Sequence, residues 1–421
     1  MSETRARRSR LSEAEAAEQA LAHVQHLCQT IGPRPVGSEA EAAAARYVKQ
    51  RLHELGLRHV REQEFEAPRS AWLPYPIAGA SALLGIAFWT LLRGSAFGAY
   101  LGALGCGFGL WEVYAELSFG WTPLAGLVPR TRSRNIVGSL APTEGEGRNA
   151  IVFAHLDTQR TPLLSRSRTA LRMALIAFYL AMALLTLTTL AFVASWFAEF
   201  SLPAWTGLPG AAVTLVAVAV MLHSEATPYT EGANDNASAV GVALALAGNF
   251  ATRPLRNTRL WIVFTGAEET GCHGAAAFLA QEGENLIQAY AIALEGLGIE
   301  GPAYSTREGM LRLHRSNSEL LRLAQQVARA NPSLGLRPAV IRGGCTEAGL
   351  AARRGYRSMA LVGLDAGNLL PYWHHPGDRF EVIRTEALAA GYAAAVSLIE
   401  RLDELPVSLK LSGVKPLSER G

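Results

Sequence analysis

The chain has 421 residues, and its 39 Lys and Arg nearly balance its 36 Asp and Glu, which gives a net charge of +3. This balance, together with the lack of a basic stripe interleaved with aromatic residues, argues against nucleic acid as a partner. The four cysteines, Cys28, Cys106, Cys272 and Cys345, are scattered, so they predict neither a disulfide framework nor a cysteine-based zinc site.

The N-terminal segment predicts two helices followed by a strand. Ser12 with Glu15 and Ser38 with Glu41 each have the capping-box spacing that opens a helix. The segment between these helices, residues 31–37, is rich in Gly and Pro and predicts a loop. A strand is expected near residues 59–65, ahead of the first hydrophobic run.

Four hydrophobic runs, arranged as two pairs, interrupt the polar sequence. They are Ser70 to Leu92, Gly94 to Trp111, Met173 to Ala198 and Phe200 to Leu222. A membrane-spanning helix needs about 20 apolar residues. Three of the runs are that long, and the second is marginal but rich in glycines, which permit close helix packing. We therefore predict two transmembrane hairpins in membrane lipid, residues 70–117 and 170–222. The alternative is a pair of buried hairpins in a soluble core.

The two hairpins also predict an orientation. Because their turns are very short, each hairpin returns the chain to the side it left, and all polar segments share one face. Seven arginines flank the spans on that face: Arg130, Arg132, Arg134, Arg160, Arg166, Arg168 and Arg172. The far turns offer only Arg93 and Glu199. The positive-inside rule then predicts a multi-pass protein of the cell membrane with its polar body in the cytoplasm. Arg5, Arg7, Arg8 and Arg10 agree but lie far from the first span.

The remaining segments alternate between strands and helices. Strands are expected at 135–140, 150–153, 259–264, 289–294 and 357–362, and helices at 236–250, 274–280, 318–330 and 385–405. This alternation predicts one α/β domain with a mixed, mostly parallel sheet flanked by helices. The domain comprises residues 1–69, 118–169 and 223–405, interrupted by the two hairpins, and residues 406–421 form a polar tail.

Polar side chains follow the ends of several predicted strands, which is where open α/β sheets bind their ligands. They are His155, Asp157, Asp235, Glu268, Glu269, Glu295, His374, His375 and Asp378. Each motif by itself is weak, because a carboxylate after a strand is commonly a solvated loop residue or a helix cap. Together they supply imidazoles and carboxylates, which suit a borderline-hard divalent metal, zinc first.

In these motifs the chain resembles the di-zinc aminopeptidases, a family that includes bacterial leucyl aminopeptidases, yeast aminopeptidase Y and glutamate carboxypeptidase. The shared order is His-x-Asp, Asn-Asp-Asn-Ala-Ser, Ala-Glu-Glu-x-Gly, an acid after a strand, and His followed four residues later by Asp. The resemblance runs from the first helix through the closing helix. It implies a zinc exopeptidase-like fold with two Zn²⁺ ions per chain.

The resemblance also implies a role for each matching residue. His155 and Glu295 would bind one zinc, Glu269 and His374 the other, and Asp235 would bridge them. Glu268 would be the general base, and Asp157 would orient His155. His374 is preferred over His375 because the family's His-x-x-x-Asp spacing runs from His374 to Asp378.

Two features depart from most soluble members of that family. Glu295 stands where they have Asp, and its Leu-Glu-Gly setting is more similar to the membrane-embedded branch. The loop of residues 344–347 lacks the family's Ser-Asp pair, so the resemblance implies no substrate contacts there.

These observations predict a membrane-anchored di-zinc metallopeptidase that hydrolyses peptides, an aminopeptidase in the first instance. The alternatives are a carboxypeptidase, a glutaminyl cyclase-like enzyme, or a non-catalytic membrane scaffold on a peptidase fold. A transporter is disfavoured because the spans carry no ionisable residue at a midplane site. Since the second hairpin lies between His155 and Asp235, we expect the catalytic mouth near the membrane surface and a preference for short or apolar peptides. The oligomeric state stays open.

Overall fold

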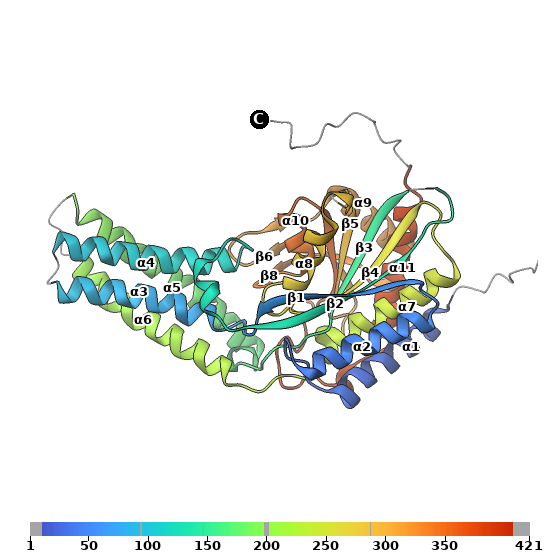
Figure 1. Ribbon diagram of the computed structural model, residues 1–421, viewed down its shortest axis with the longest axis horizontal. Coiled ribbons are helices and arrows are strands. Elements are labelled where there is room, and N and C mark those ends of the chain that lie inside the picture. The colour runs from blue at the N-terminus through green and yellow to red at the C-terminus, as the bar shows by residue number, and fades with distance from the viewer. Residues whose placement is uncertain (1–10, 93–94, 146, 198–201, 287, 407–421) are drawn as a thin grey trace, which may run out of the picture.

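A computed structural model describes residues 11–92, 95–145, 147–197, 202–286 and 288–406 of the chain. The arginines before residue 11, both charged residues of the far turns (Arg93 and Glu199) and residues 407–421 of the predicted tail lie outside the described residues. Figure 1 shows an α/β body from which an elongated bundle of helices projects.

The first two helices, α1 (Glu13–Gln25) and α2 (Glu39–Glu54), begin at the predicted serine caps. At α1 both halves of the capping box form. At α2 the Glu41 amide donates to Ser38 Oγ at 3.1 Å, but the Glu41 carboxylate turns into the body. There it accepts hydrogen bonds from the amide of Gly37 and the hydroxyl of Ser133, both at 2.7 Å. The sequence pattern therefore identifies where α2 begins, but the carboxylate of Glu41 bonds to groups in the body and not to the N-cap backbone.

In the described residues, nine strands form one mixed sheet. They are β1 (His59–Pro68), β2 (Arg130–Leu140), β3 (Arg148–His155), β4 (Thr258–Thr265), β5 (Tyr290–Glu295), β6 (Pro302–Gly309), β7 (His314–Arg315), β8 (Arg337–Arg342) and β9 (Arg357–Gly363). Their order is β1-β2-β4-β3-β5-β9-β6-β7, with β8 paired to β6.

Parallel pairing is confined to the centre, β4-β3-β5-β9, and to β6 with β8; the other ladders are antiparallel. The sheet is mixed as predicted, but the expectation of mostly parallel pairing holds only for these strands. One reason is the first helical hairpin. It returns the chain to the end of β1 where it departed, and Arg130 pairs with Pro68, so β2 runs back antiparallel to β1.

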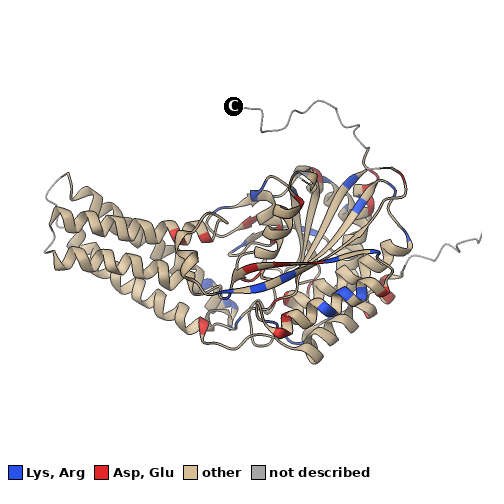
Figure 2. Cartoon of the chain, viewed as in Figure 1, with Lys and Arg blue, Asp and Glu red and all other residues tan. Residues whose placement is uncertain are grey.

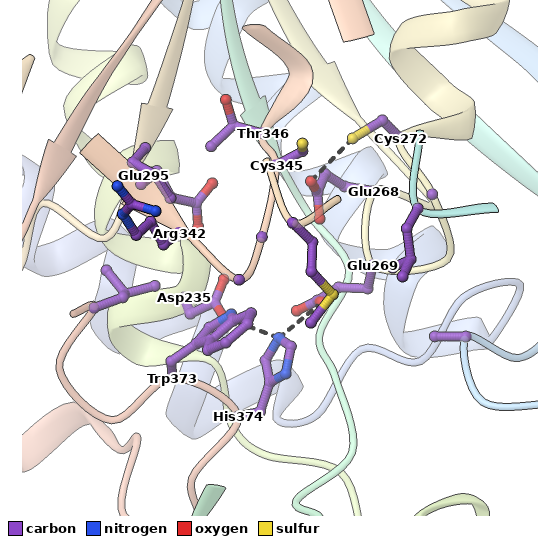
Figure 3. Close-up of a pocket in the computed structure, with 18 of the residues that line it drawn as sticks. Asp235, Glu268, Glu269, Cys272, Glu295, Arg342, Cys345, Thr346, Trp373 and His374 are labelled. Carbon is purple, nitrogen blue, oxygen red and sulfur yellow. Dashed lines mark hydrogen bonds and ion pairs between the residues drawn. The ribbon is translucent and has the colours of Figure 1, made fainter. Parts of the chain in front are cut away.

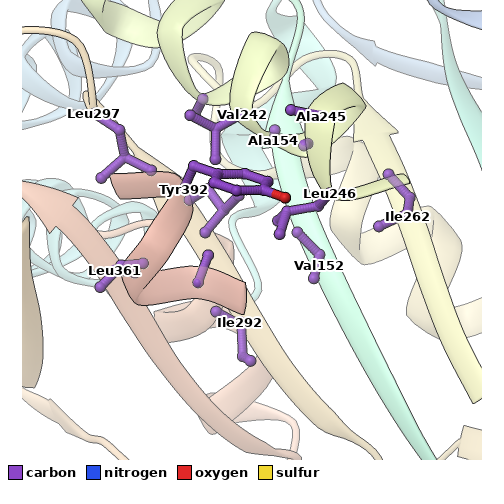
Figure 4. Packing of buried hydrophobic residues seen from close by; sticks show 14 of the residues in the cluster. Val152, Ala154, Val242, Ala245, Leu246, Ile262, Ile292, Leu297, Leu361 and Tyr392 are labelled. Atoms are coloured by element: carbon purple, nitrogen blue, oxygen red, sulfur yellow. The ribbon is translucent and has the colours of Figure 1, made fainter. Parts of the chain in front are cut away.

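Helices cover both faces of the sheet. On one face α1 and α2 pack with α7 (Ala239–Thr252), α9 (Ser318–Ala330) and α11 (Thr385–Asp403). On the other face lie α8 (His273–Glu282) and α10 (Glu347–Arg353). Figure 4 shows Tyr392 of α11 packed among Val152, Ile292 and Leu361 of the central strands. These strands are buried on both sides, which explains why they are continuous apolar runs in the sequence.

The bundle consists of α3 (Pro74–Leu91), α4 (Ala96–Glu116), α5 (Arg168–Ala194) and α6 (Leu202–Glu225). Helix α3, helix α5 and residues 205–225 of α6 are long and apolar enough to cross a membrane; α4 is not among them. Within the described part of the bundle, Asp, Glu, Lys and Arg occur only near the body, as Figure 2 shows. The predicted glycine packing is confirmed, because a Cβ atom at Gly105 would lie 2.6 Å from the carbonyl oxygen of Ser81.

Candidate metal centre

The predicted site residues lie at one edge of the sheet. His155 ends β3, Glu295 ends β5, and Glu268 and Glu269 follow β4. Because these strands are parallel and in register, with His155 opposite Thr265 and Phe153 opposite Ala293, their carboxyl ends meet at the same edge. Two loops add Asp235, before α7, and His374, between β9 and α11. These side chains, except His155, line a cavity of about 220 Å³ (Figure 3).

Asp235 lies between the two histidines. Its Oδ1 atom is 3.2 Å from Nε2 of His155, and its Oδ2 atom is 3.6 Å from Nε2 of His374. Each histidine also faces a second carboxylate: Nε2 of His155 is 3.4 Å from Oε1 of Glu295, and Nε2 of His374 is 3.1 Å from Oε2 of Glu269. Two imidazoles thus share one carboxylate, each through a different oxygen.

The helix predicted at 236–250 begins only at Ala239, because residues 233–238 form an irregular turn. Asp235 and Asn236 both have non-helical backbone angles there. This turn lets Asn236 reach β5, where its side-chain amide donates to Oε2 of Glu295 at 3.2 Å and its Oδ1 atom accepts from the amide of Gly296 at 3.0 Å. Asn236 therefore holds Glu295 in place.

Two buried aspartates hold the backbone of the loops that carry the site. Asp157 accepts hydrogen bonds from the amides of Glu268 and Glu269, both at 3.0 Å. Asp378 accepts from the amides of Asn234 and Asp235, at 2.7 and 3.1 Å. Each carboxylate therefore fixes two consecutive residues, at least one of which projects into the site.

His155 is oriented differently from the arrangement that the resemblance implies. Its Nδ1 atom lies 3.0 Å from the main-chain oxygen of Asp157, whereas the nearer carboxylate oxygen of Asp157 is 3.7 Å away. A hydrogen bond from Nδ1–H to this carbonyl fixes the ring with Nε2 facing Asp235 and Glu295, so that loss of the Nε2 proton would leave a lone pair for a metal. The resulting tautomer is the one a metal-binding imidazole needs.

Glu268 stands beside His155, and no hydrogen bond or ion pair joins it to Asp235 within the described residues. Its Oε2 atom is 4.0 Å from Nε2 of His155, and its Oε1 atom accepts the thiol of Cys272 at 3.1 Å (Figure 3). Burial raises the pKa of Glu268 well above its ordinary value, and the neighbouring carboxylates Glu347 and Glu269 add to the effect. A carboxyl with a raised pKa at the edge of such a cluster is suited to accept and release a proton.

The electrostatics of the cluster favour a bound cation. Burial alone lowers the pKa of His155, but Glu295, Glu268 and Asp235 raise it well above its ordinary value. For the carboxyl of Glu295, by contrast, burial itself raises the pKa well above its ordinary value. Without a cation these groups retain protons, because so many carboxylates cannot ionise together in a dry site. A divalent metal would take the place of the protons.

The donor set fits zinc. Ligand atoms of His155, Asp235 and Glu269 all lie within 4.8 Å of one another. Oε1 of Glu269 is buried and has no hydrogen-bond partner in the part of the chain that the structure describes, which is unusual for a carboxylate unless a metal completes its contacts. Nitrogen and carboxylate oxygen are also the donors that zinc accepts.

His375 lies apart from this cluster, as the spacing to Asp378 implied. Its Nδ1 atom accepts the amide of Gly377 at 2.8 Å, and its Nε2 atom lies 3.2 Å from the main-chain oxygen of Arg166. The neighbouring loop of residues 344–346, whose sequence departs from the family pattern, does line the cavity.

Two contributors to the site were not identified from the sequence. The guanidinium of Arg34 is buried and donates to main-chain oxygens of Leu156, Glu231 and Gly232, at 2.6, 2.9 and 3.1 Å. It thereby ties the loop after His155 to the loop before Asp235. Glu41 accepts the amide of Ala267, next to Glu268, at 3.3 Å. Neither supporting role has a local signal: the spacing of Glu41 predicts a helix cap instead, and a buried arginine such as Arg34 is uncommon.

Comparisons with known proteins agree with this geometry. Residues 207–399, just under half of the chain, match peptidase family M28. The matched segment contains Asp235, Glu268, Glu269, Glu295 and His374, and begins after His155 and Asp157. No curated protein matches the chain.

Solved structures share the fold at low sequence identity. A zinc-dependent exopeptidase from Parabacteroides distasonis ATCC 8503 is 17% identical, with a TM-score of 0.51 over 91% of this chain and 97% of that one. The zinc aminopeptidase BSAP from Bacillus subtilis is 15% identical, with a TM-score of 0.53 over 91% and 94%. A glutaminyl cyclase from Porphyromonas gingivalis is 16% identical, with a TM-score of 0.52 over 94% and 100%. The matches support peptidase family M28 and a zinc exopeptidase-like fold.

Proposed function

We propose that the chain is a membrane-anchored metallopeptidase with two zinc ions that hydrolyses peptide bonds, in the first instance as an aminopeptidase. The observation that carries the proposal is the position of Asp235, whose two carboxylate oxygens each face a different histidine. This is the geometry expected of a carboxylate that bridges two metals. His155 and Glu295 would complete one metal, and Glu269 and His374 the other.

The side chains of the site have separate roles in the proposed hydrolysis. Two bound zinc ions supply Lewis acidity, which polarises the scissile carbonyl and acidifies a water molecule. Glu268, which is not a proposed metal ligand, accepts the proton of the attacking water and delivers it to the nitrogen of the leaving amine. The Cys272 thiol holds one oxygen of Glu268, so the other faces the cluster. Asp157 and Asp378 keep the loops in position throughout.

Hydrolysis of one apolar peptide, offered with a free or an acetylated N-terminus, tests this function on detergent-purified protein with zinc. An aminopeptidase cleaves only the free peptide. Cleavage of both forms would instead indicate a carboxypeptidase or endopeptidase, and cyclisation of an N-terminal glutamine without hydrolysis would indicate a glutaminyl cyclase-like enzyme. If neither peptide is cleaved and a peptide with N-terminal glutamine is not cyclised while metal is bound, the proposed peptidase function is refuted.

The matched variant is Glu268→Gln, which keeps the size of the side chain but cannot accept a proton. We expect turnover to fall by about 100-fold or more with metal content unchanged, because Glu268 is not proposed as a ligand. Full activity in this variant would refute the assignment of Glu268 as the base.

The bundle supports the membrane part of the proposal. Its apolar helices α3, α5 and α6 could each span a bilayer, and its charged residues stand near the body. We infer that the bundle lies in the cell membrane and that the body faces the cytoplasm. Proteolysis of inside-out and right-side-out membrane vesicles tests the orientation: the body should be digested only in the inside-out vesicles.

A further inference from the structure

A second cavity, of about 330 Å³, adjoins the metal-site cavity. The two cavities share walls that include Glu269, His374, Trp373 and Leu175. Its volume is in the range of small-molecule binding sites, about 300–1,000 Å³. The metal centre therefore opens on one side into a further compartment.

This compartment extends into the interior of the helix bundle. All four bundle helices line it, with Gly79 from α3, Val113 from α4 and Ala217 from α6 among the lining residues. Along α5 the lining runs from Leu171 to Leu185, a distance of roughly 21 Å at 1.5 Å per residue. The cavity is thus elongated along the bundle and has one end at the metals.

The walls select for an alkyl chain. Polar side chains gather at the metal end, where Gln159, Ser165, Glu269 and His374 lie. Deeper in, the hydroxyl of Thr214 already donates to the carbonyl oxygen of Gly210 at 2.7 Å. A peptide drawn into this space would leave its N–H and C=O groups without partners, which is costly in an apolar setting. A hydrocarbon chain has no such groups.

A positively charged side chain, that of Arg342, lines the metal-site cavity. Arg342 is exposed and lines the same cavity as Glu295 (Figure 3). Within the described residues it forms no ion pair, whereas Arg168 is paired with Asp365 at 2.7 Å. A guanidinium in this position is suited to bind the carboxylate of a substrate.

We propose that the same metal centre also hydrolyses amides that join a long-chain fatty acid to an amino acid. The alkyl chain occupies the bundle cavity, the amide lies over the metals, and the amino-acid carboxylate binds Arg342. The oxygen of water bonds to the acyl carbon and the C–N bond breaks. The water's protons pass, by way of Glu268, to the departing nitrogen, so the products are a fatty acid and an amino acid. This activity rests on the proposed function, because both use one hydrolytic site.

The test measures kcat/KM for the butanoyl, octanoyl and dodecanoyl amides of leucine, with protein purified in detergent and loaded with zinc. Burial of each methylene favours binding, so we expect kcat/KM to rise about three- to fourfold per methylene until the cavity is full. A ratio near one between the dodecanoyl and butanoyl substrates would overturn the proposal.

A matched pair of variants separates the cavity from partitioning into the detergent micelle. Ala217→Trp fills the cavity, whereas Ala219 is exposed on the same helix and does not line it. The ratio of kcat/KM for dodecanoyl over butanoyl leucine should fall toward one in Ala217→Trp and stay unchanged in Ala219→Trp. Equal ratios in both variants would assign the gain to the micelle and refute the proposal. If Ala217→Trp does not fold, Ala174→Phe on α5, which also lines the cavity, replaces it.

The role of Arg342 has its own readout. Arg342→Gln should lower kcat/KM for dodecanoyl leucine about tenfold or more, the loss expected for a charge-assisted hydrogen bond. The methyl ester of dodecanoyl leucine has no free carboxylate for Arg342 to bind. The kcat/KM for this ester should therefore be the same in Arg342→Gln and in the unaltered protein. An equal loss on acid and ester would remove Arg342 from the proposal.

Failure of this inference is distinguishable from failure of the proposed function. Cleavage of peptides without cleavage of any acyl amide refutes the acyl substrate and leaves the peptidase standing. If nothing is cleaved, labelling with a photoactivatable fatty acid still tests the cavity. Label on the lining residues of α5 and α6, reduced in Ala217→Trp, supports chain binding; label confined to outward-facing residues of the bundle overturns it.

Discussion

Asp157→Asn tests whether a buried aspartate places the base and a metal ligand together. In the unaltered chain Oδ1 accepts the amide of Glu268 and Oδ2 the amide of Glu269, both at 3.0 Å. Asparagine has one oxygen and one NH₂ group, so one of the two backbone N–H groups would face another donor. The residue is fully buried, and water cannot readily replace the lost contact.

The expected magnitude follows from that lost hydrogen bond. A hydrogen bond to a charged group contributes about 1.5–3 kcal/mol. If this loss displaces Glu268 and Glu269 from their working positions, kcat/KM should fall by about 10- to 150-fold. Metal content should also fall, because Glu269 is a proposed ligand whereas Glu268 is not.

Asp403 offers a control, because it also accepts hydrogen bonds from two consecutive backbone amides. These amides lie before the start of β4, whereas those held by Asp157 follow its end. Asp403 accepts the amides of Arg256 and Asn257, both at 2.8 Å, just before β4 begins. Asp403→Asn should therefore lower Tm as Asp157→Asn does but leave kcat/KM unchanged. The assays are peptide hydrolysis, metal analysis and thermal unfolding. Equal kcat/KM for Asp157→Asn and the unaltered enzyme would refute the reasoning, as would an equal loss in both variants.

Three further predictions concern the metals and a buried acid. Removal of metal with phenanthroline should abolish hydrolysis and lower Tm, since the clustered carboxylates lose their counter-charge, and added zinc should restore both; an unchanged Tm and rate would exclude a resident metal. His374→Ala should lose bound metal, whereas His375→Ala, outside the cluster, should keep it; metal analysis showing the reverse would shift the proposed ligand to His375. Burial raises the pKa of Glu308 from 4.5 to about 8. The folded chain thus keeps this proton to higher pH than the unfolded chain, and stability is lost as pH rises from about 4.5 to 8. Glu308→Gln should remove this loss, at most about 5 kcal/mol, so its Tm should exceed that of the unaltered protein at high pH and match it near pH 5; parallel Tm curves would contradict the shift.

Elements with strong local signals were predictable. Helix α9 has the predicted bounds, residues 318–330, because its apolar side chains recur at helical spacing and Asn317 caps its start. Strands β3, β4 and β5 are apolar runs that end in the polar motifs of the site. By contrast β6, β8 and α10 were not predicted. Strand β6 contains Ser, Thr, Arg and Glu, and it is a strand because β8 and β9 flank it.

The sequence also indicated which residues meet at the site. His155, Glu268, Glu269 and Glu295 lie at or just after strand ends, which a parallel sheet brings together, whereas Asp235 and His374 lie on loops and were assigned by the resemblance. Tertiary structure decided what holds those residues. Glu41, whose spacing predicts a reciprocal cap, instead supports the loop of Glu268, and Arg34 joins two loops through main-chain oxygens. The apolar cavity beside the metal centre was also decided by the tertiary structure. Its walls come from four helices separated in the chain, and whether packed helices leave a space between them depends on how their side chains interlock, which periodicity does not specify.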